Sequence, residues 1–154
     1  KIGAVLDDLK TWHARNDRAE AALEARLERG RRLRSAFDNE DDKVAVRRHL
    51  EETLSDFDSS LEWWAMGQAV LAEFLRSEKD PQSLVHAREA AIKGFDRHPR
   101  SLGGRRCLYH KAAIEAPAYR LTAMAVDGPG RRSIRMCDSP ANSSCSTRIS
   151  IWRT

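Results

Sequence analysis

Three cysteines and five histidines are the side chains in this sequence best suited to metal binding or nucleophilic catalysis. The cysteines stand at positions 107, 137 and 145, a spacing that matches no zinc pattern such as two CxxC pairs. No two histidines are four residues apart on a predicted helix, as a helical zinc motif requires. No serine lies in a GxSxG turn, the signature of one large class of hydrolases. The residue pattern therefore predicts no metal ion, no cofactor and no enzyme.

The individual cysteines indicate structural rather than chemical roles. Cys107 stands beside Leu108 in a predicted short helix, which favours a buried structural thiol over a reactive one. Cys137 and Cys145 belong to a C-terminal segment with little periodicity. Unpaired thiols are favoured there, with a loop disulfide in an oxidising compartment as the alternative.

The charge distribution argues against a nucleic-acid partner. Charged residues make up 32% of the chain, and the formal net charge is +4. The best candidate for a basic patch is the arginine run over residues 29–34, but acidic residues flank it on both sides. We interpret this run as a solvated helix end, where cations are favoured. The Gly103-Gly104 pair before two arginines is likewise interpreted as a helix-start turn rather than an anion site.

The adjacent tryptophans Trp63 and Trp64 are the candidates for contact with a partner. Two neighbouring residues cannot both face one helical stripe. Trp64 fits the inward row together with Gln68, and Trp63 falls in a neighbouring groove between helices. An exposed Trp63 would be the first candidate for a protein contact. We therefore predict Trp63, Trp64 and Gln68 as partner-contact residues.

Apolar residues recur at helical spacing through the first 116 residues. The spacing predicts one long helix over 2–37, or two helices separated near Asn16. Further helices are predicted over about 41–55, over 61–75, over 81–97 and, as a shorter helix, over about 101–114. The elements that would hold any functional side chain are therefore helices.

Two helix starts carry capping signals. Ser59 followed by Glu62 reads as a capping box, in which the serine oxygen accepts a first-turn N–H and the glutamate reaches back. Asp80 before Pro81 is a second start, because aspartate caps and proline at the first helical position loses no hydrogen bond.

The apolar period changes from helical to two after Pro117. The predicted fold is mainly α, with four or five helices in antiparallel, tetratricopeptide-like pairs. A helical repeat-like domain is predicted over 1–116. A β-strand pair over 117–136, read as a short hairpin and as a candidate start of a β-sandwich, follows it. A disordered tail is predicted over the serine-rich residues 137–154.

Five residues of the central helices, Trp64, Gly67, Ala87, Ala91 and Pro99, resemble a degenerate tetratricopeptide unit. Such units stack because each buries a face that it cannot bury alone. A heptad coiled coil for the first helix and a plain helical bundle for the rest remain as alternatives.

A longer resemblance covers about half of the chain, from Leu61 to Met136. Its residues are Trp64, Gln68, Ala69, Leu71, Ala72, Glu73, Phe74, Ala87 to Ala91, His98 to Gly104, Cys107, Ile114 and Pro117. This order resembles the N-terminal helical region of large bacterial alpha-2-macroglobulin-like proteins. In that family a tetratricopeptide-like segment leads through a short helix into the first macroglobulin β-sandwich domain. No residue of the family's thioester chemistry is carried over, and the bait region is absent.

The resemblance implies a non-catalytic scaffold segment of an envelope protein of the protease-inhibitor family. Its role would be domain spacing and protein–protein contact, with the macroglobulin domains of the parent protein as partners and the cell envelope or periplasm as the location. The sequence itself shows no transmembrane segment and no signal peptide. The alternative is a free-standing tetratricopeptide-like adaptor that holds a peptide in the groove between its helix pairs.

Overall fold

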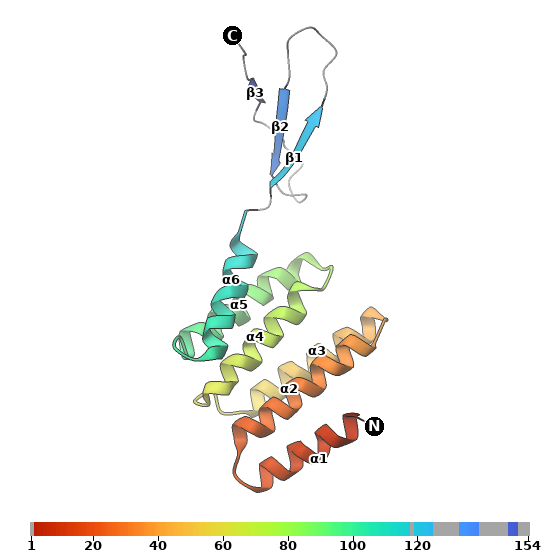
Figure 1. Ribbon diagram of the computed structural model, residues 1–154, viewed down its shortest axis with the longest axis vertical. Helices are drawn as coiled ribbons and strands as arrows, with labels where there is room; N and C mark the ends of the chain where they lie inside the picture. Colours follow the sequence, from red (N-terminus) through yellow and green to blue (C-terminus); the bar gives the residue numbers. More distant parts are fainter. Residues whose placement is uncertain (1, 118, 125–132, 139–147, 151–154) are drawn as a thin grey trace. The chain divides into compact units, whose positions relative to one another are not determined.

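The computed structural model describes residues 2–117, 119–124, 133–138 and 148–150 (Figure 1). Six helices lie within these residues. They are α1 (Ile2–Arg15), α2 (Ala19–Ala36), α3 (Glu40–Asp56), α4 (Glu62–Arg76), α5 (Pro81–Arg97) and α6 (Leu102–Glu115). The chain divides into two compact units, Lys1–Ile114 and Glu115–Thr154. The prediction of a mainly helical protein is confirmed.

Of the two alternatives predicted for residues 2–37, the structure has the second, two helices separated near Asn16, which brings the total to six helices against the predicted four or five. The break lies at residues 16–18, where Asp17 adopts a left-handed conformation with φ of 53°. The Asn16 side chain donates to the Trp12 carbonyl at 2.7 Å, and the Asn16 and Arg18 amides both donate to His13. These bonds satisfy the last carbonyls of α1 and turn the chain back toward α2.

One of the two predicted helix starts is confirmed and the other is wrong. Helix α5 begins at Pro81, and the Asp80 carboxylate accepts from the Gln82 amide at 3.2 Å. Helix α4 begins at Glu62 with no side-chain cap. The carboxylate that acts there is Asp58, which accepts from the Ser60 amide and hydroxyl at 2.8 and 2.6 Å. An Asx turn thus replaces the capping box predicted for Ser59.

Helix α4 forms the centre of the helical unit's core. Eleven of its 15 residues are buried, and it packs against α2, α3 and α5 (Figure 1). Trp64 is buried, and its indole N–H donates to the Leu54 carbonyl of α3 at 3.1 Å. Burial of this apolar face is the main driving force that holds the helices together. Leucines of the two preceding helices complete the core; they are Leu23, Leu27, Leu50 and Leu54.

Glycines allow α4, α5 and α6 to approach one another closely. A Cβ at Gly94 would lie 2.5 Å from Cys107 Sγ and 2.8 Å from Gln68 Cβ. A Cβ at Gly103 would overlap the Met66 backbone. The Cys107 thiol is fully buried, as predicted, and donates to the Ala65 carbonyl at 3.3 Å. The two glycines of α5 and α6 are therefore packing residues.

Several large apolar side chains remain at the surface of the helical unit. Helix α1 has no buried residue, and its exposed face carries Ile2, Val5, Leu9 and Trp12. The helical spacing of the apolar residues in 81–97 predicts that Leu84 and Val85 of α5 face inward, but they are 46% and 50% exposed. The buried face of α5 is formed instead by small residues; they are Ser83, Ala87, Ala90, Ala91 and Gly94.

The second unit contains the strands β1 (Tyr119–Met124), β2 (Ser133–Asp138) and β3 (Arg148–Ser150). They form an antiparallel sheet in the order β1-β2-β3, with Tyr119 opposite Asp138 and Ile134 opposite Ile149. The predicted turn over 127–130 and most of the predicted tail lie outside the described residues. The assignments of 117–136 as a strand pair and of 137–154 as a disordered tail stay predictions.

Candidate functional site

The structure separates the three predicted contact residues. Trp64 and Gln68 are only 4% and 3% exposed, so both belong to the core. Trp63 is half-buried and turns toward α2, where its indole N–H donates to the Glu24 carboxylate at 2.6 Å. This arrangement matches the predicted division between an inward Trp64 and a Trp63 between helices. Among the three residues, only Trp63 offers surface to a partner in this conformation.

Trp63 lines a groove formed by alternate helices, which we call the central groove. Its volume is about 690 Å³. Helix α2 contributes Glu24 and Arg31; α4 contributes Trp63, Met66 and Glu73; and α6 contributes Leu102, Arg106, Tyr109 and His110. These helices are far apart in the sequence. They line one groove because α4 packs against α2 on one side and against α6 on another.

The α2 wall of the central groove is electrically compensated. Arg31 forms an ion pair with Glu24 at 3.1 Å and a longer one with Glu28 at 3.5 Å. Glu24 therefore accepts from both Arg31 and the Trp63 indole. These bonds hold the Trp63 ring in a fixed orientation and leave the α2 wall without an uncompensated acid at this point.

Two arginines beside His110 lack acidic partners among the described residues: Arg106 of α6, which lines the groove, and Arg76 of α4, which does not. Arg76 Nη1 lies 3.1 Å from His110 Nδ1. Because arginine can only donate, this ring nitrogen must accept, and the imidazole is neutral. Burial lowers the pKa of His110, and Arg76 lowers it further. Arg106 donates to the Met66 sulfur at 3.7 Å. Within the described part of the chain, neither Arg76 nor Arg106 forms an ion pair.

The α6 wall of the central groove also presents apolar surface. Leu102 is 50% exposed and Tyr109 is 67% exposed, although both line the groove. Leu102 precedes Arg106 by four residues and Tyr109 follows it by three, so all three side chains lie on one face of α6. The central groove thus combines the exposed Tyr109 ring and Leu102 methyl groups with the guanidinium group of Arg106, which forms no ion pair with a described residue.

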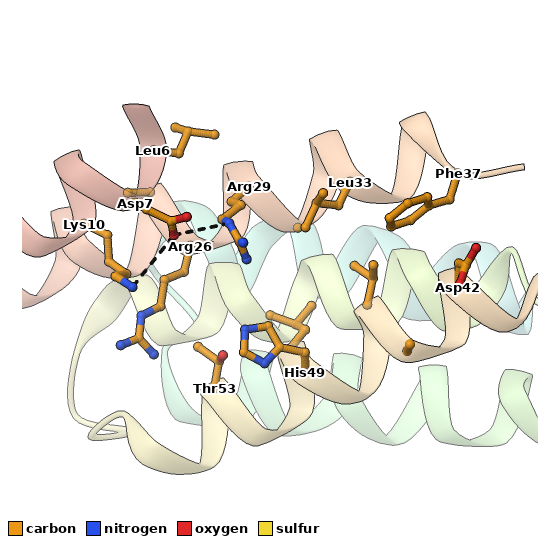
Figure 2. A pocket seen from close by; sticks show the side chains of 15 residues that line it. Leu6, Asp7, Lys10, Arg26, Arg29, Leu33, Phe37, Asp42, His49 and Thr53 are labelled. Carbon is orange, nitrogen blue, oxygen red and sulfur yellow. Dashed lines mark ion pairs between the residues drawn. The ribbon is translucent and has the colours of Figure 1, made fainter. Parts of the chain in front are cut away.

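A second groove, the α1 groove, lies between α1 and α3 over α2 (Figure 2). Its volume is about 420 Å³. Figure 2 shows Asp7 joined to both Arg29 and Lys10, at 3.3 and 3.8 Å. Leu33 of α2 and Phe37, which follows the end of α2, supply apolar lining toward α3. Because Arg29 and Lys10 are both paired with Asp7, the α1 groove offers mainly apolar packing to a partner.

The prediction that the arginine run over 29–34 is a solvated helix end holds for Arg32, whose side chain is 64% exposed, but is wrong for Arg34. Arg34 has a side chain only 10% exposed. It donates to the Phe74 carbonyl at 2.9 Å, the Ser77 hydroxyl at 2.7 Å and the Lys43 carbonyl at 3.1 Å. The contacts come from residues 9 to 43 positions away, so local spacing does not reveal them. Arg34 is a bridge between helices.

Among the described residues, no group of three or more His, Cys, Asp or Glu is placed to hold a metal ion. Burial raises the pKa of the Cys107 thiol to about 12, which keeps it protonated and inert. None of the helices in the part of the chain that the structure describes is both long and apolar enough to cross a membrane.

Sequence reasoning identified Trp63 but missed the rest of the central groove. Arg106 was considered only as part of an anion site at the Gly103-Gly104 pair, in favour of a helix-start turn, and Tyr109 was not singled out. The available signal was the alignment of Leu102, Arg106 and Tyr109 on one helix face.

Comparisons of the chain with protein-family models, with curated proteins and with solved structures found no match.

Proposed function

We propose that the helical unit is a non-catalytic, repeat-like docking module that binds a segment of another protein in the central groove. The observation that carries the proposal is the groove itself. It is formed across α2, α4 and α6 and exposes Tyr109 and Leu102 beside Trp63, whose ring is held in place by Glu24. Exposed aromatic side chains on rigid helices are typical of binding surfaces because little side-chain entropy is lost on contact.

Tetratricopeptide-like pairing supports this proposal. The helix pairs α2–α3 and α4–α5 are in contact, and α4 also packs against both members of the preceding pair. Alternate helices then line one surface, as in stacked helical repeats that bind extended partners. In this reading the chain acts as the adaptor that the sequence suggested as an alternative.

The test is peptide selection on the full-length chain with a random nonapeptide phage library, followed by affinity measurement with synthetic peptides. We expect Tyr109→Ala to weaken selected peptides by about tenfold or more. Leu84→Ala is the control, because Leu84 is also exposed but stands on α5 outside the groove. Peptides that bind Tyr109→Ala and the wild type equally, or a library that yields no binder, would contradict the proposal.

The lead-in segment of an alpha-2-macroglobulin-like protein is a second candidate. It is favoured by the division of the chain into a helical unit and a separate unit that contains strands. In this candidate the module spaces and docks sandwich domains of an envelope protein. The test is the genomic DNA at the 3′ end: a sandwich-like frame that continues past codon 136 supports it, and a clean stop after Thr154 without such a frame counts against it.

A further inference from the structure

We propose that the α1 groove binds an amphiphilic monocarboxylate, such as a medium-chain fatty acid, with its carboxylate at Arg26 and its alkyl chain along Leu33 and Phe37. This site is separate from the central groove and does not depend on the docking function proposed above. Its basis is the Arg26 guanidinium, which lines the groove and forms no ion pair with a described residue. The Nε atom of Arg26 is buried and has no hydrogen-bond partner.

The directions of the helices place the polar and the apolar lining at opposite ends of the α1 groove. Helices α2 and α3 follow one another and pack together, so the start of α2 lies beside the end of α3 (Figure 1). Arg26 Cζ accordingly lies 5.1 Å from the centre of the Phe57 ring, just after α3. Figure 2 shows Lys10 and Thr53 at this end of the groove and Phe37 at the other.

The groove lining has a net positive charge, and the excess lies at the Arg26 end. Three permanent cations face two carboxylates in the lining; the cations are Lys10, Arg26 and Arg29. One carboxylate, Asp7, pairs with Arg29 and Lys10 at 3.3 and 3.8 Å, and the other, Asp42, lies at the opposite end (Figure 2). The Arg26 end therefore holds three cations against one carboxylate. Such an excess in a recessed site attracts an anion.

Acids outside the lining do not neutralise this excess by direct contact. Glu52 and Asp56 of α3 are exposed, and neither forms an ion pair with a cation of the lining. Water and salt therefore screen their charges. A buried N–H without an acceptor is unfavourable, and a ligand carboxylate that accepts from Nε and from a terminal N–H of Arg26 would remove that penalty.

The rest of the α1 groove suits an alkyl chain. Its volume of about 420 Å³ falls in the range of small-molecule sites, and such sites combine apolar lining with a few polar groups. Arg26 and Leu33 are seven residues apart on α2, which is about 10 Å along the helix axis. An extended alkyl chain of about eight carbons spans that distance. A peptide fits less well, because its backbone polar groups would lose water against Leu33 and Phe37.

The experiment titrates the full-length chain with sodium octanoate by isothermal titration calorimetry, at concentrations below those at which octanoate forms micelles. The neutral analogue 1-octanol is titrated in parallel. We expect octanoate to bind at least about tenfold more tightly than octanol, because only the carboxylate pairs with Arg26. Arg26→Gln should weaken octanoate about tenfold and leave octanol within about twofold. Phe37→Ala should weaken both ligands by the same factor, since Phe37 lines the apolar end.

Arg32→Gln is the matched control, because Arg32 stands on the same helix, is 64% exposed and does not line the groove. It should leave the octanoate affinity within about twofold of the wild type. The proposal is overturned if the wild type does not bind octanoate, if it binds octanol equally well, or if Arg32→Gln costs as much as Arg26→Gln. If Arg26→Gln lowers helicity by circular dichroism, the comparison of octanoate with octanol on the wild type decides alone.

Hydrogen exchange separates a bound ligand from a detergent effect of octanoate. A ligand between α1 and α3 should slow the exchange of α1 amides at least about threefold, because it stabilises the conformation in which α1 is packed. Helix α5 contributes nothing to the groove lining, so its amides should be unchanged. Faster exchange in α1 would show that octanoate loosens the helices and would overturn the proposed site.

Discussion

Protonation of His110 should destabilise the helical unit. Its imidazole is buried and accepts from Arg76, so a proton on Nδ1 would place two cations in contact. Its pKa is lowered by burial, by Arg76 and by Arg106, while Glu73 acts in the opposite direction. In the unfolded chain the His110 imidazole has an ordinary pKa of about 6.5. Between this pH and the lowered pKa, His110 is therefore protonated in the unfolded chain but not in the folded chain. Stability is therefore lost as the pH falls below about 6.5 toward the lowered pKa.

We predict that His110→Asn makes stability less dependent on pH, because the asparagine oxygen still accepts near the Nδ1 position and takes up no proton. The measurement is the free energy of unfolding in urea at about pH 7 and pH 5. The control is His49→Asn, whose side chain is 67% exposed. An unchanged pH dependence in His110→Asn would contradict the assignment of a neutral, buried imidazole.

A second prediction at the residue scale concerns Gly94. Gly94→Ala should lower the free energy of unfolding by about 1–3 kcal/mol, because the new Cβ meets Cys107 and Gln68 in a filled core. Gly30→Ala in α2 is the matched control. Its Cβ would lie 3.9 Å from the Phe74 ring, so it should raise stability by up to about 1 kcal/mol through helix propensity. Chemical unfolding of both variants measures the difference, and equal effects would refute close packing at Gly94.

At the scale of the elements, Glu78 in the loop between α4 and α5 contacts side chains of α2, α3 and α5. Its side chain is 9% exposed and lies 2.8 Å from Arg47 Nε on α3 and 3.9 Å from Arg34 Nη1 on α2. Ser83 of α5 donates to the same carboxylate at 3.0 Å. Burial lowers the pKa of Arg34, and the negative charge of Glu78 opposes that effect.

Glu78→Gln should destabilise the helical unit by about 2–3 kcal/mol, because it leaves two mostly buried guanidinium groups without their shared anion. Glu51→Gln is the comparison: that carboxylate also pairs with Arg47 but is 40% exposed, so its loss should cost less than about 1 kcal/mol. Thermal or urea unfolding of the two variants provides the values. Equal losses would show that Glu78 acts as an ordinary surface partner.

Helix α1 is predicted to be the least stable helix, since it buries no residue and packs against α2 alone among the described helices. Hydrogen exchange followed by mass spectrometry should show its amides exchanging at least about tenfold faster than those of α4. The interior of α4 serves as the internal standard because eleven of its residues are buried. Equal protection would mean that the exposed face of α1 is covered in solution.

Local signals predicted the helices well where the signal was itself local. Pro81 and Asp80 defined the start of α5, and its end at Arg97 agrees with the predicted range. The capping box failed because Asp58 competes for the same turn. Leu84 shows the limit of periodicity. Helical spacing identifies an apolar row, but it does not say whether another element covers that row. The central groove, formed by α2, α4 and α6, depends on tertiary contacts that no single stretch encodes.

At the scale of the whole molecule, the hydrophobic core of the described residues lies within the first unit, between Leu23 and Cys107. We predict that a chain ending at Ala116 folds independently, with a thermal midpoint within about 5 °C of the full chain, since it keeps every residue of that core. Circular dichroism at 222 nm gives both the helicity and the midpoint. A truncated chain that melts without cooperativity would show that the helical unit needs the second one.

Arg34 has one more consequence for the whole protein. It satisfies the carbonyl of Phe74 and the hydroxyl of Ser77, at the end of a helix that lies 40 residues further along the chain. The C-terminal end of α4 is therefore capped by a side chain from another helix pair. The helix pairs of this chain are consequently not interchangeable. If the α4–α5 pair were moved into a different repeat array without Arg34, the Phe74 carbonyl and the Ser77 hydroxyl would lose this hydrogen-bond donor.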